Sequence, residues 1–117
     1  MENKLLSVEA EPITLADGGD GKAIFIACNI YNIEEAANFV SDEVAGAFRR
    51  TRFLSGNVNM LLITILGEMS AQQFSDAWLA KCHQDKLLAG FMSDISEATV
   101  IHGTEDGETL GEASLLL

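Results

Sequence analysis

The 117-residue sequence is poor in the residues on which disulfide-rich, collagen-like and zinc-binding proteins depend. It contains one proline and two cysteines. Cys28 and Cys82 are too few for a disulfide framework, and no Cys-x-x-Cys or Cys/His spacing indicates a metal site. We therefore expect buried free thiols, no metal, and a cytoplasmic protein in a reducing compartment. A redox pair would form only if the fold brought the two cysteines together.

Basic residues are also scarce. Lys and Arg number 7 against 18 Asp and Glu, so the net charge near neutral pH is −11. This sign of charge opposes binding to nucleic acids and to anionic membranes. Three of the basic residues are concentrated at Arg49, Arg50 and Arg52. They could bind an anion or an acidic partner, or two of them could simply stabilise the carboxyl end of a helix.

No apolar run is long enough to cross a bilayer. The longest, Met60 to Leu66, spans seven residues and is interrupted by Thr64, whereas a membrane helix needs about 20. The first residues lack the basic start and apolar stretch of a signal peptide. The length and the 48% of hydrophobic residues predict one globular domain. Its expected parts are an amino-terminal strand and turn (1–21), an α+β core (22–103) and an acidic tail (104–117).

Several segments have the apolar patterns of β-strands. Residues 4–15 alternate apolar and polar side chains, and Pro12 restricts that segment to a sheet edge. The glycine-rich residues 17–21 predict a reversal and match a calcium loop poorly. The remaining expected strands are Lys22–Ile30, a short one at Phe53–Leu54, then Val58–Leu66 and Ser96–His102.

Two segments have the apolar spacing of amphipathic helices. Asn32, with Glu35 three residues later, resembles a capping box that begins a helix running to about Arg50. Ser70 is positioned to cap a second helix, whose apolar side drifts near Gln84 and so indicates a kink or break there. Residues 103–111 are typical of a solvated tail, and the final Leu115–Leu117 must be buried in this chain or in another.

The core segments follow in the order strand, helix, short strand, long strand, helix, strand. This is the split-βαβ, ferredoxin-like order (βαββαβ), here with an extra amino-terminal strand, and it belongs to the α+β class. Helices on one face leave the other face of the sheet needing cover, and two such sheets commonly cover each other. We therefore expect a homodimer.

The pattern over residues 24–102 resembles the dimeric α/β barrels of the antibiotic-biosynthesis monooxygenase type, including their haem-degrading branch. The resemblance rests on Phe25–Asn29, Ser55–Val58, Ser70–Phe74, Trp78–Leu79 and His83. It implies a small monooxygenase-like or ligand-binding barrel without a flavin, acting on an aromatic or haem-like apolar ligand. Asn29 and Trp78 match the positions that such proteins use at the ligand pocket.

Haem is a possible cofactor under this resemblance, but the sequence departs from the haem-binding pattern. The position of the axial histidine, about ten residues after the tryptophan, is Leu88. His83 follows Trp78 by only five residues, which places it about 140° around an ideal helix. A haem role for His83 would therefore require the helix to break between the two residues.

Each candidate catalytic residue also has an ordinary structural interpretation. Asn29 could orient a substrate carbonyl or phenolate, or be a hydrogen-bonded core amide. Trp78 could line an aromatic pocket or pack in the core. His83 could be a general base or a surface residue.

The acidic composition supports a second class of function. A non-catalytic module, of the immunity or inhibitor type, could use its −11 charge to steer toward a basic protein partner. The enzyme hypothesis predicts a pocket containing Asn29 and Trp78, whereas the acidic tail with its Leu115–Leu117 end suits the binding hypothesis.

Overall fold

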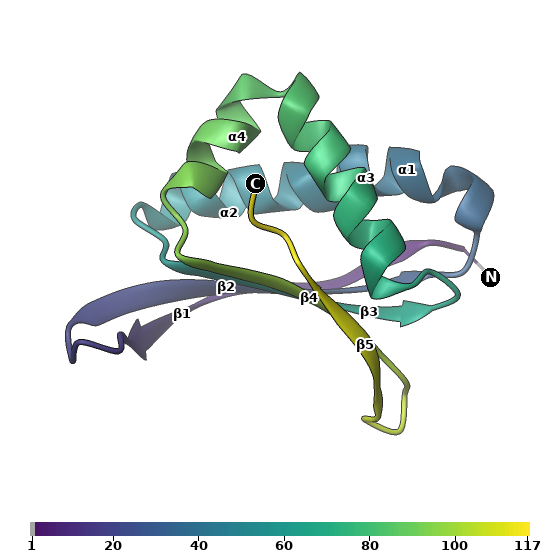
Figure 1. Cartoon of the computed structure of the whole chain (residues 1–117), viewed down its shortest axis with the longest axis horizontal. Coiled ribbons are helices and arrows are strands. Elements are labelled where there is room, and N and C mark those ends of the chain that lie inside the picture. Colours follow the sequence, from purple (N-terminus) through teal and green to yellow (C-terminus); the bar gives the residue numbers. More distant parts are fainter. Residues whose placement is uncertain (1) are drawn as a thin grey trace.

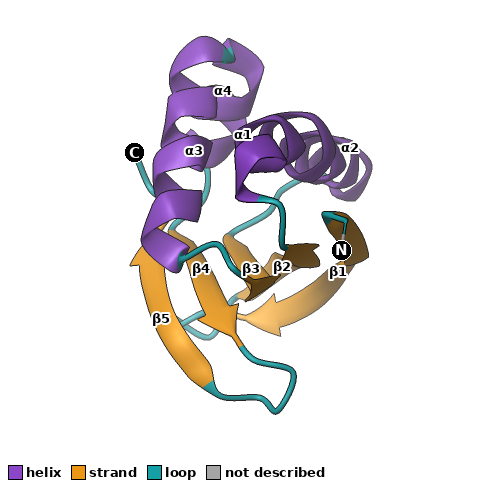
Figure 2. Ribbon diagram, turned by 90° about the vertical axis from the view of Figure 1, so that its right-hand side faces the viewer, coloured by secondary structure: helices purple, strands orange, loops and turns teal. Residues whose placement is uncertain are grey.

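The computed structural model describes residues 2–117 as one mixed five-stranded sheet with helices on one of its faces (Figures 1 and 2). The α+β class is confirmed. The strands are β1 (Lys4–Thr14), β2 (Asp20–Ile30), β3 (Met60–Gly67), β4 (Glu97–Gly103) and β5 (Thr109–Ser114). The first helical segment comprises η1 (Ile33–Glu35), α1 (Ala36–Phe39), the π-helix η2 (Val40–Val44) and α2 (Ala45–Ser55), and the second comprises α3 (Ala71–Gln84) and α4 (Lys86–Ser93).

The amino-terminal hairpin forms as the sequence predicts. β1 pairs antiparallel with β2 and lies at the edge of the sheet, where the missing N–H of Pro12 is tolerated. Gly18 adopts a φ of 87° in the connecting turn. The start of β1 is held by Asn3, whose Oδ1 accepts hydrogen bonds from the backbone N–H groups of Tyr31 and Asn32.

The expected short strand at Phe53–Leu54 is wrong, because both residues belong to α2. The helix continues to Ser55 and ends at Gly56, whose positive φ of 75° suits a glycine. Lys22 Nζ donates to the Ser55 carbonyl at 2.6 Å and stabilises this end. The capping box expected at Asn32 is also wrong, since Asn32 makes no side-chain cap and the segment begins with a 3₁₀ turn.

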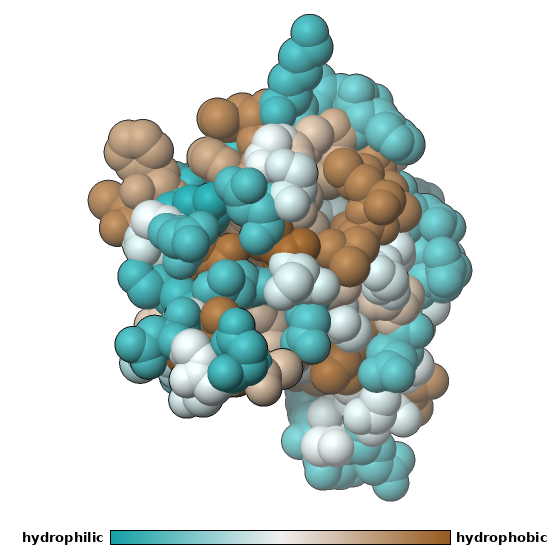
Figure 3. Space-filling view, turned by 60° about the vertical axis from the view of Figure 1, so that its left-hand side comes forward, coloured by the Kyte–Doolittle hydropathy of each residue, from teal (hydrophilic) through white to brown (hydrophobic). Residues whose placement is uncertain are grey.

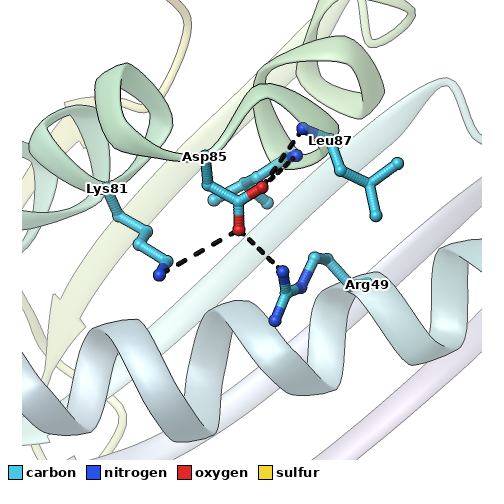
Figure 4. A network of polar contacts seen from close by, with 5 residues as sticks. Arg49, Lys81, Asp85 and Leu87 are labelled. Carbon is cyan, nitrogen blue, oxygen red and sulfur yellow. Dashed lines mark hydrogen bonds and ion pairs between the residues drawn. The ribbon is translucent and has the colours of Figure 1, made fainter.

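The second helical segment follows the predicted pattern closely. The Ser70 hydroxyl accepts from the Gln73 backbone N–H while the Gln73 side chain accepts from the Ser70 N–H, a complete capping box. The expected break lies between α3 and α4 at Asp85. Figure 4 shows why the new helix begins there: Asp85 Oδ1 accepts from the backbone N–H groups of Leu87 and Leu88, both at 3.1 Å.

The carboxyl-terminal region is not a solvated tail. Residues Thr109–Ser114 form β5, which pairs antiparallel with β4. Leu115 then reaches the core and is fully buried, so part of the terminal leucine triplet is covered within this chain. Gly111, Ala113 and Leu115 alternate with more exposed residues, and Asp106–Gly107 is a common hairpin dipeptide. This alternation and this dipeptide are the sequence signals that indicate a hairpin strand here.

The strand connectivity differs from the expected βαββαβ order. The sheet order is β1-β2-β3-β4-β5, with β2, β3 and β4 mutually parallel. Each of the two crossovers steps to the next strand in the same direction. Right-handed crossovers that never reverse direction place all their helices on one face of the sheet, as Figure 2 shows.

The core lies between this helical layer and the sheet. Alternate residues of β2, such as Ile24 and Ile26, point into it and are at most 1% exposed. Helical side chains complete the core, with the largest buried ones being Trp78, Phe48 and Phe74. The other face of the sheet has no covering element among residues 2–117, and this feature positions the candidate site.

Candidate functional site

Trp78 lies in the core, on the helical side of the sheet. Its side chain is 0% exposed and is enclosed by Phe48, at a centroid distance of 5.8 Å with the rings edge to face, and by Phe74 at 6.3 Å. Its indole Nε1 is buried and has no hydrogen-bond partner within residues 2–117. The ring therefore packs the interface between α2 and α3.

Asn29 lies on the opposite face of the sheet from Trp78. Its neighbours in β2, Cys28 and Ile30, are fully buried in the core that contains Trp78, and side chains alternate along a strand. The Oδ1 atom of Asn29 is buried and has no hydrogen-bond partner in the described chain. The structure thus separates the two residues that the resemblance would place at one pocket, although it leaves the Asn29 acceptor free.

His83 joins neither residue. It is exposed on α3, and the helix is continuous from Ala71 to Gln84, so no break separates it from Trp78. Leu88 is fully buried at the position expected for an axial histidine. The remaining histidine, His102, lies on the helical side of β4, and its Nε2 is 2.8 Å from the Gly67 carbonyl oxygen. The described residues therefore offer no imidazole facing an apolar cavity, and they do not fit a haem.

The two cysteines are buried and free. Burial raises the pKa of the Cys28 thiol from its ordinary 9.0 to about 12. Burial, followed by the negative charge of Asp85, raises the pKa of Cys82 to about 11. Both sulfurs stay protonated near neutral pH, which makes them poor nucleophiles.

No metal site or membrane helix is found in residues 2–117. No three His, Cys, Asp or Glu side chains in that range are grouped so that they could hold a metal ion. None of its helices combines the length and the hydrophobicity needed to span a bilayer.

The arginine cluster has three different environments. Arg49 lies 2.7 Å from Asp85 (Figure 4), and Arg52 lies 3.0 Å from Asp94 with its guanidinium 5.2 Å from the ring centroid of Phe91. Arg50 is exposed and forms no ion pair within the part of the chain that the structure describes.

The uncovered side of the sheet is the most distinctive surface of the molecule. We call it the open face, and sequence reasoning anticipated its need for cover but not its residues. The side chains of its centre are half-buried and largely apolar, and they come from three adjacent parallel strands: Phe25, Ala27, Asn29, Leu62, Thr64, Leu66, Thr99 and Ile101.

Glutamates border the open face on both outer strands. Glu9 of β1 is paired with Phe25, and Glu112 of β5 is paired with Ile101. Both carboxylates are exposed, while Lys4, which is paired with Asn29, is the one basic residue that the register places on this face. The surface is therefore an apolar centre between two acidic edges.

Comparison with known proteins gives no further guide to this surface. No family model matches the chain, and neither a curated protein nor a solved structure matches it. Its function has to be inferred from the geometry of its own residues.

Proposed function

We propose that the protein is a non-catalytic binding module whose open face docks a partner with an apolar centre and a basic rim. The observation that carries this proposal is the uncovered apolar centre of a parallel sheet. Parallel strands are almost always covered on both faces, because their side chains are apolar on both sides. Phe25, Leu62 and Ile101 lie on neighbouring strands, and no element within residues 2–117 covers them.

The charge at the edges of the open face defines the partner. Glu9 and Glu112 flank the apolar rows, so a partner with Lys or Arg around an apolar patch would pair with both edges. Complementary charge of this kind increases the association rate and disfavours acidic competitors. Direct stacking of two copies through their open faces would instead bring like-charged edges together.

We also propose that this role is cytoplasmic, which suits two free, buried thiols.

A pair of designed peptides tests this proposal. One alternates leucine and lysine, and its control alternates leucine and glutamate, so the two differ mainly in the sign of their charge. We expect the basic peptide to bind, in a fluorescence anisotropy titration, more tightly at low than at high salt. The acidic peptide should not bind, because its charges match those of the open face.

Variants of the chain locate the binding surface. The double variant Glu9→Lys/Glu112→Lys should weaken binding of the basic peptide by about tenfold or more, and Leu62→Thr should weaken it without changing the charge. Glu34→Lys changes an exposed charge on η1 and serves as the matched control. Equal binding of both peptides, or equal affinity of all variants, would contradict the proposal.

A second candidate function keeps the ligand hypothesis and rests on Asn29. Its half-buried side chain lies on the open face, and its buried Oδ1 has no partner within residues 2–117, so a small apolar ligand such as a phenol could donate to it by entering between the neighbouring side chains. Trp78 and His83 would not touch a ligand there. We expect titration with a simple naphthol to show binding that Asn29→Ala reduces and that Thr99→Ala does not, while the circular dichroism spectrum stays unchanged. Identical naphthol affinity in the wild type and Asn29→Ala would exclude this site.

A further inference from the structure

We infer that two copies of the chain form a closed dimer through two surfaces at one end of the fold, each copy inserting a basic apolar knob into an acidic hollow of the other. This inference does not depend on the proposed function, because neither surface includes the centre of the open face. The knob lies on the helical layer. The hollow lies at one end of the opposite side of the sheet, beyond the centre of the open face, where β1 ends and β3 and β4 begin.

The knob is the end of α2 together with the exposed side of α4. Phe53 and Leu54 are 81% and 84% exposed, and Leu87 is 58% exposed. Burying such side chains is favourable, so leaving three of them together in water is costly. They surround a depression of about 370 Å³ together with Arg49, Arg50 and Phe91.

Figure 3 brings forward the side of the molecule that carries the carboxyl end of α2 in Figure 1. Apolar groups project there at the edge of the outline, beside hydrophilic ones. The knob is also basic. Arg50 has no ion-pair partner within residues 2–117, and Arg49 forms an ion pair there with one carboxylate only, that of Asp85. An apolar, positively charged projection is unusual on a chain with a net charge of −11.

The hollow has the complementary character. It is an open hollow of about 540 Å³ lined by apolar residues, notably Ile13, Leu15 and Met60, and by the acidic residues Asp17 and Glu97. Its volume lies in the range of cavities that enclose small organic groups. An aromatic or aliphatic side chain flanked by arginine therefore matches both its apolar lining and its charge.

The positions of the two surfaces allow the dimer to close. Asn59 and Met60, which line the hollow, follow Leu54 in the chain by only five and six residues, so the knob and the hollow lie at the same end of the sheet. They lie on opposite sides of its plane, since α2 covers the helical face while Met60 belongs to the register of Ala23 and Glu97 on the other face. A two-fold rotation about an axis through this end brings each knob to the hollow of the other copy, and it uses both contacts at once.

Charge reversal tests the pairing directly by sedimentation velocity and native mass spectrometry. The wild type should be a dimer that weakens by about tenfold or more between low and high salt. Arg50→Glu and Glu97→Arg should each be largely monomeric, because each places like charges at both contacts. An equimolar mixture of the two variants should recover a heterodimer, and the double variant Arg50→Glu/Glu97→Arg should recover the homodimer.

One control variant and one further test variant separate the contact from general effects. Glu34→Arg reverses a charge on the exposed η1 segment and should leave the dimer intact. Leu54→Glu removes the apolar part of the knob and should weaken the dimer by about 30-fold, as expected for an interface hot spot. Both affected residues are exposed, so all these chains should fold like the wild type.

A wild type that stays monomeric at low salt would overturn the inference. A dimer that survives both single reversals would do the same, and would assign the contact to another surface such as the open face. The leucine–lysine peptide can be titrated into the Arg50→Glu chain whatever the oligomeric state of the wild type proves to be. The dimer and the proposed function can therefore fail separately.

Discussion

Asp85 connects three helices through one carboxylate. Its Oδ1 caps α4, while its Oδ2 lies 2.7 Å from Arg49 of α2 and 4.0 Å from Lys81 of α3 (Figure 4). We expect Asp85→Ala to lower the free energy of unfolding by about 1–3 kcal/mol, because the cap and the ion pairs disappear together. Urea denaturation followed by circular dichroism measures this change.

Asparagine at the same position separates the two contributions. Asp85→Asn keeps an oxygen for the cap but removes the charge, and Arg49 is 37% exposed, so water screens its ion pair. The loss should therefore be below about 1 kcal/mol. If Asp85→Asn were as damaging as Asp85→Ala, the ion pairs and not the cap would dominate.

Cys28 makes the free energy of unfolding depend on pH in the alkaline range. Burial raises its pKa to about 12, whereas the thiol of the unfolded chain ionises near 9.0. Below pH 9 both states hold the proton and the free energy of unfolding is unaffected. Above pH 9 the unfolded state loses its proton first, so stability falls progressively until pH reaches the folded value.

Cys28→Ala removes the contribution of Cys28 to this pH dependence and leaves that of Cys82, whose pKa is raised to about 11. We expect the variant to lose less stability than the wild type between about pH 9 and pH 11, although its smaller side chain lowers stability at every pH. Parallel stability curves for the two proteins over this range would contradict the assignment. Denaturant midpoints measured at each pH provide the comparison.

At the scale of elements, most boundaries could be predicted from the sequence. The hydroxyl of Ser70, the apolar run of β2 and the drift of the apolar stripe near Gln84 are local signals, and each has a local physical cause. Phe53–Leu54 has no such signal. Two apolar residues fit a short strand as well as a helix end. The glycine at 56, which ends the helix with a positive φ, and the contact from Lys22 to the Ser55 carbonyl both favour the helix.

That single misassignment changes the topology. A strand at Phe53–Leu54 would return the chain before β3 and allow an antiparallel pair, as in the expected order. With those residues in α2, the chain crosses over once, and β3 must run parallel to β2. The separation of Asn29 from Trp78 could not be predicted either. It depends on which face of the sheet the Asn29 side chain lies on and which face the helix carrying Trp78 covers.

Two glycines test how the elements are joined. Gly67 ends β3 with a φ of 113°, and a Cβ atom there would clash with the Ile30 carbonyl oxygen. We expect Gly67→Ala to lower the free energy of unfolding by about 2–4 kcal/mol, because both the backbone conformation and the contact become unfavourable.

Gly90 is the matched control, because it lies within α4 and a Cβ atom there would meet nothing within 4 Å. Gly90→Ala should raise the free energy of unfolding by about 0.4–1 kcal/mol through helix propensity and lower unfolded-state entropy. Thermal and urea unfolding of the pair measures both signs. Equal effects would mean that the junction after β3 relaxes to accept a side chain.

At the scale of the whole molecule, charge is distributed unevenly. Residues 4–30 and 97–114, which form the two outer hairpins, contain nine of the acids, whereas five of the seven basic residues lie on α2, α3 and α4. In Figure 1 the hairpin of β4 and β5 projects away from the helical layer, which separates its acids from those cations. Self-repulsion within the acidic hairpins should therefore destabilise the fold at low salt.

Neutralising the turn between β4 and β5 measures that repulsion. Glu105→Gln/Glu108→Gln should raise the melting temperature at low salt by a few degrees and reduce the gain that sodium chloride gives the wild type, because both changes act on the same repulsion. Lys86→Gln removes a positive charge and should increase the gain from salt. A melting temperature that falls as sodium chloride is added would instead mean that the ion pairs of Asp85 and Asp94 outweigh the repulsion.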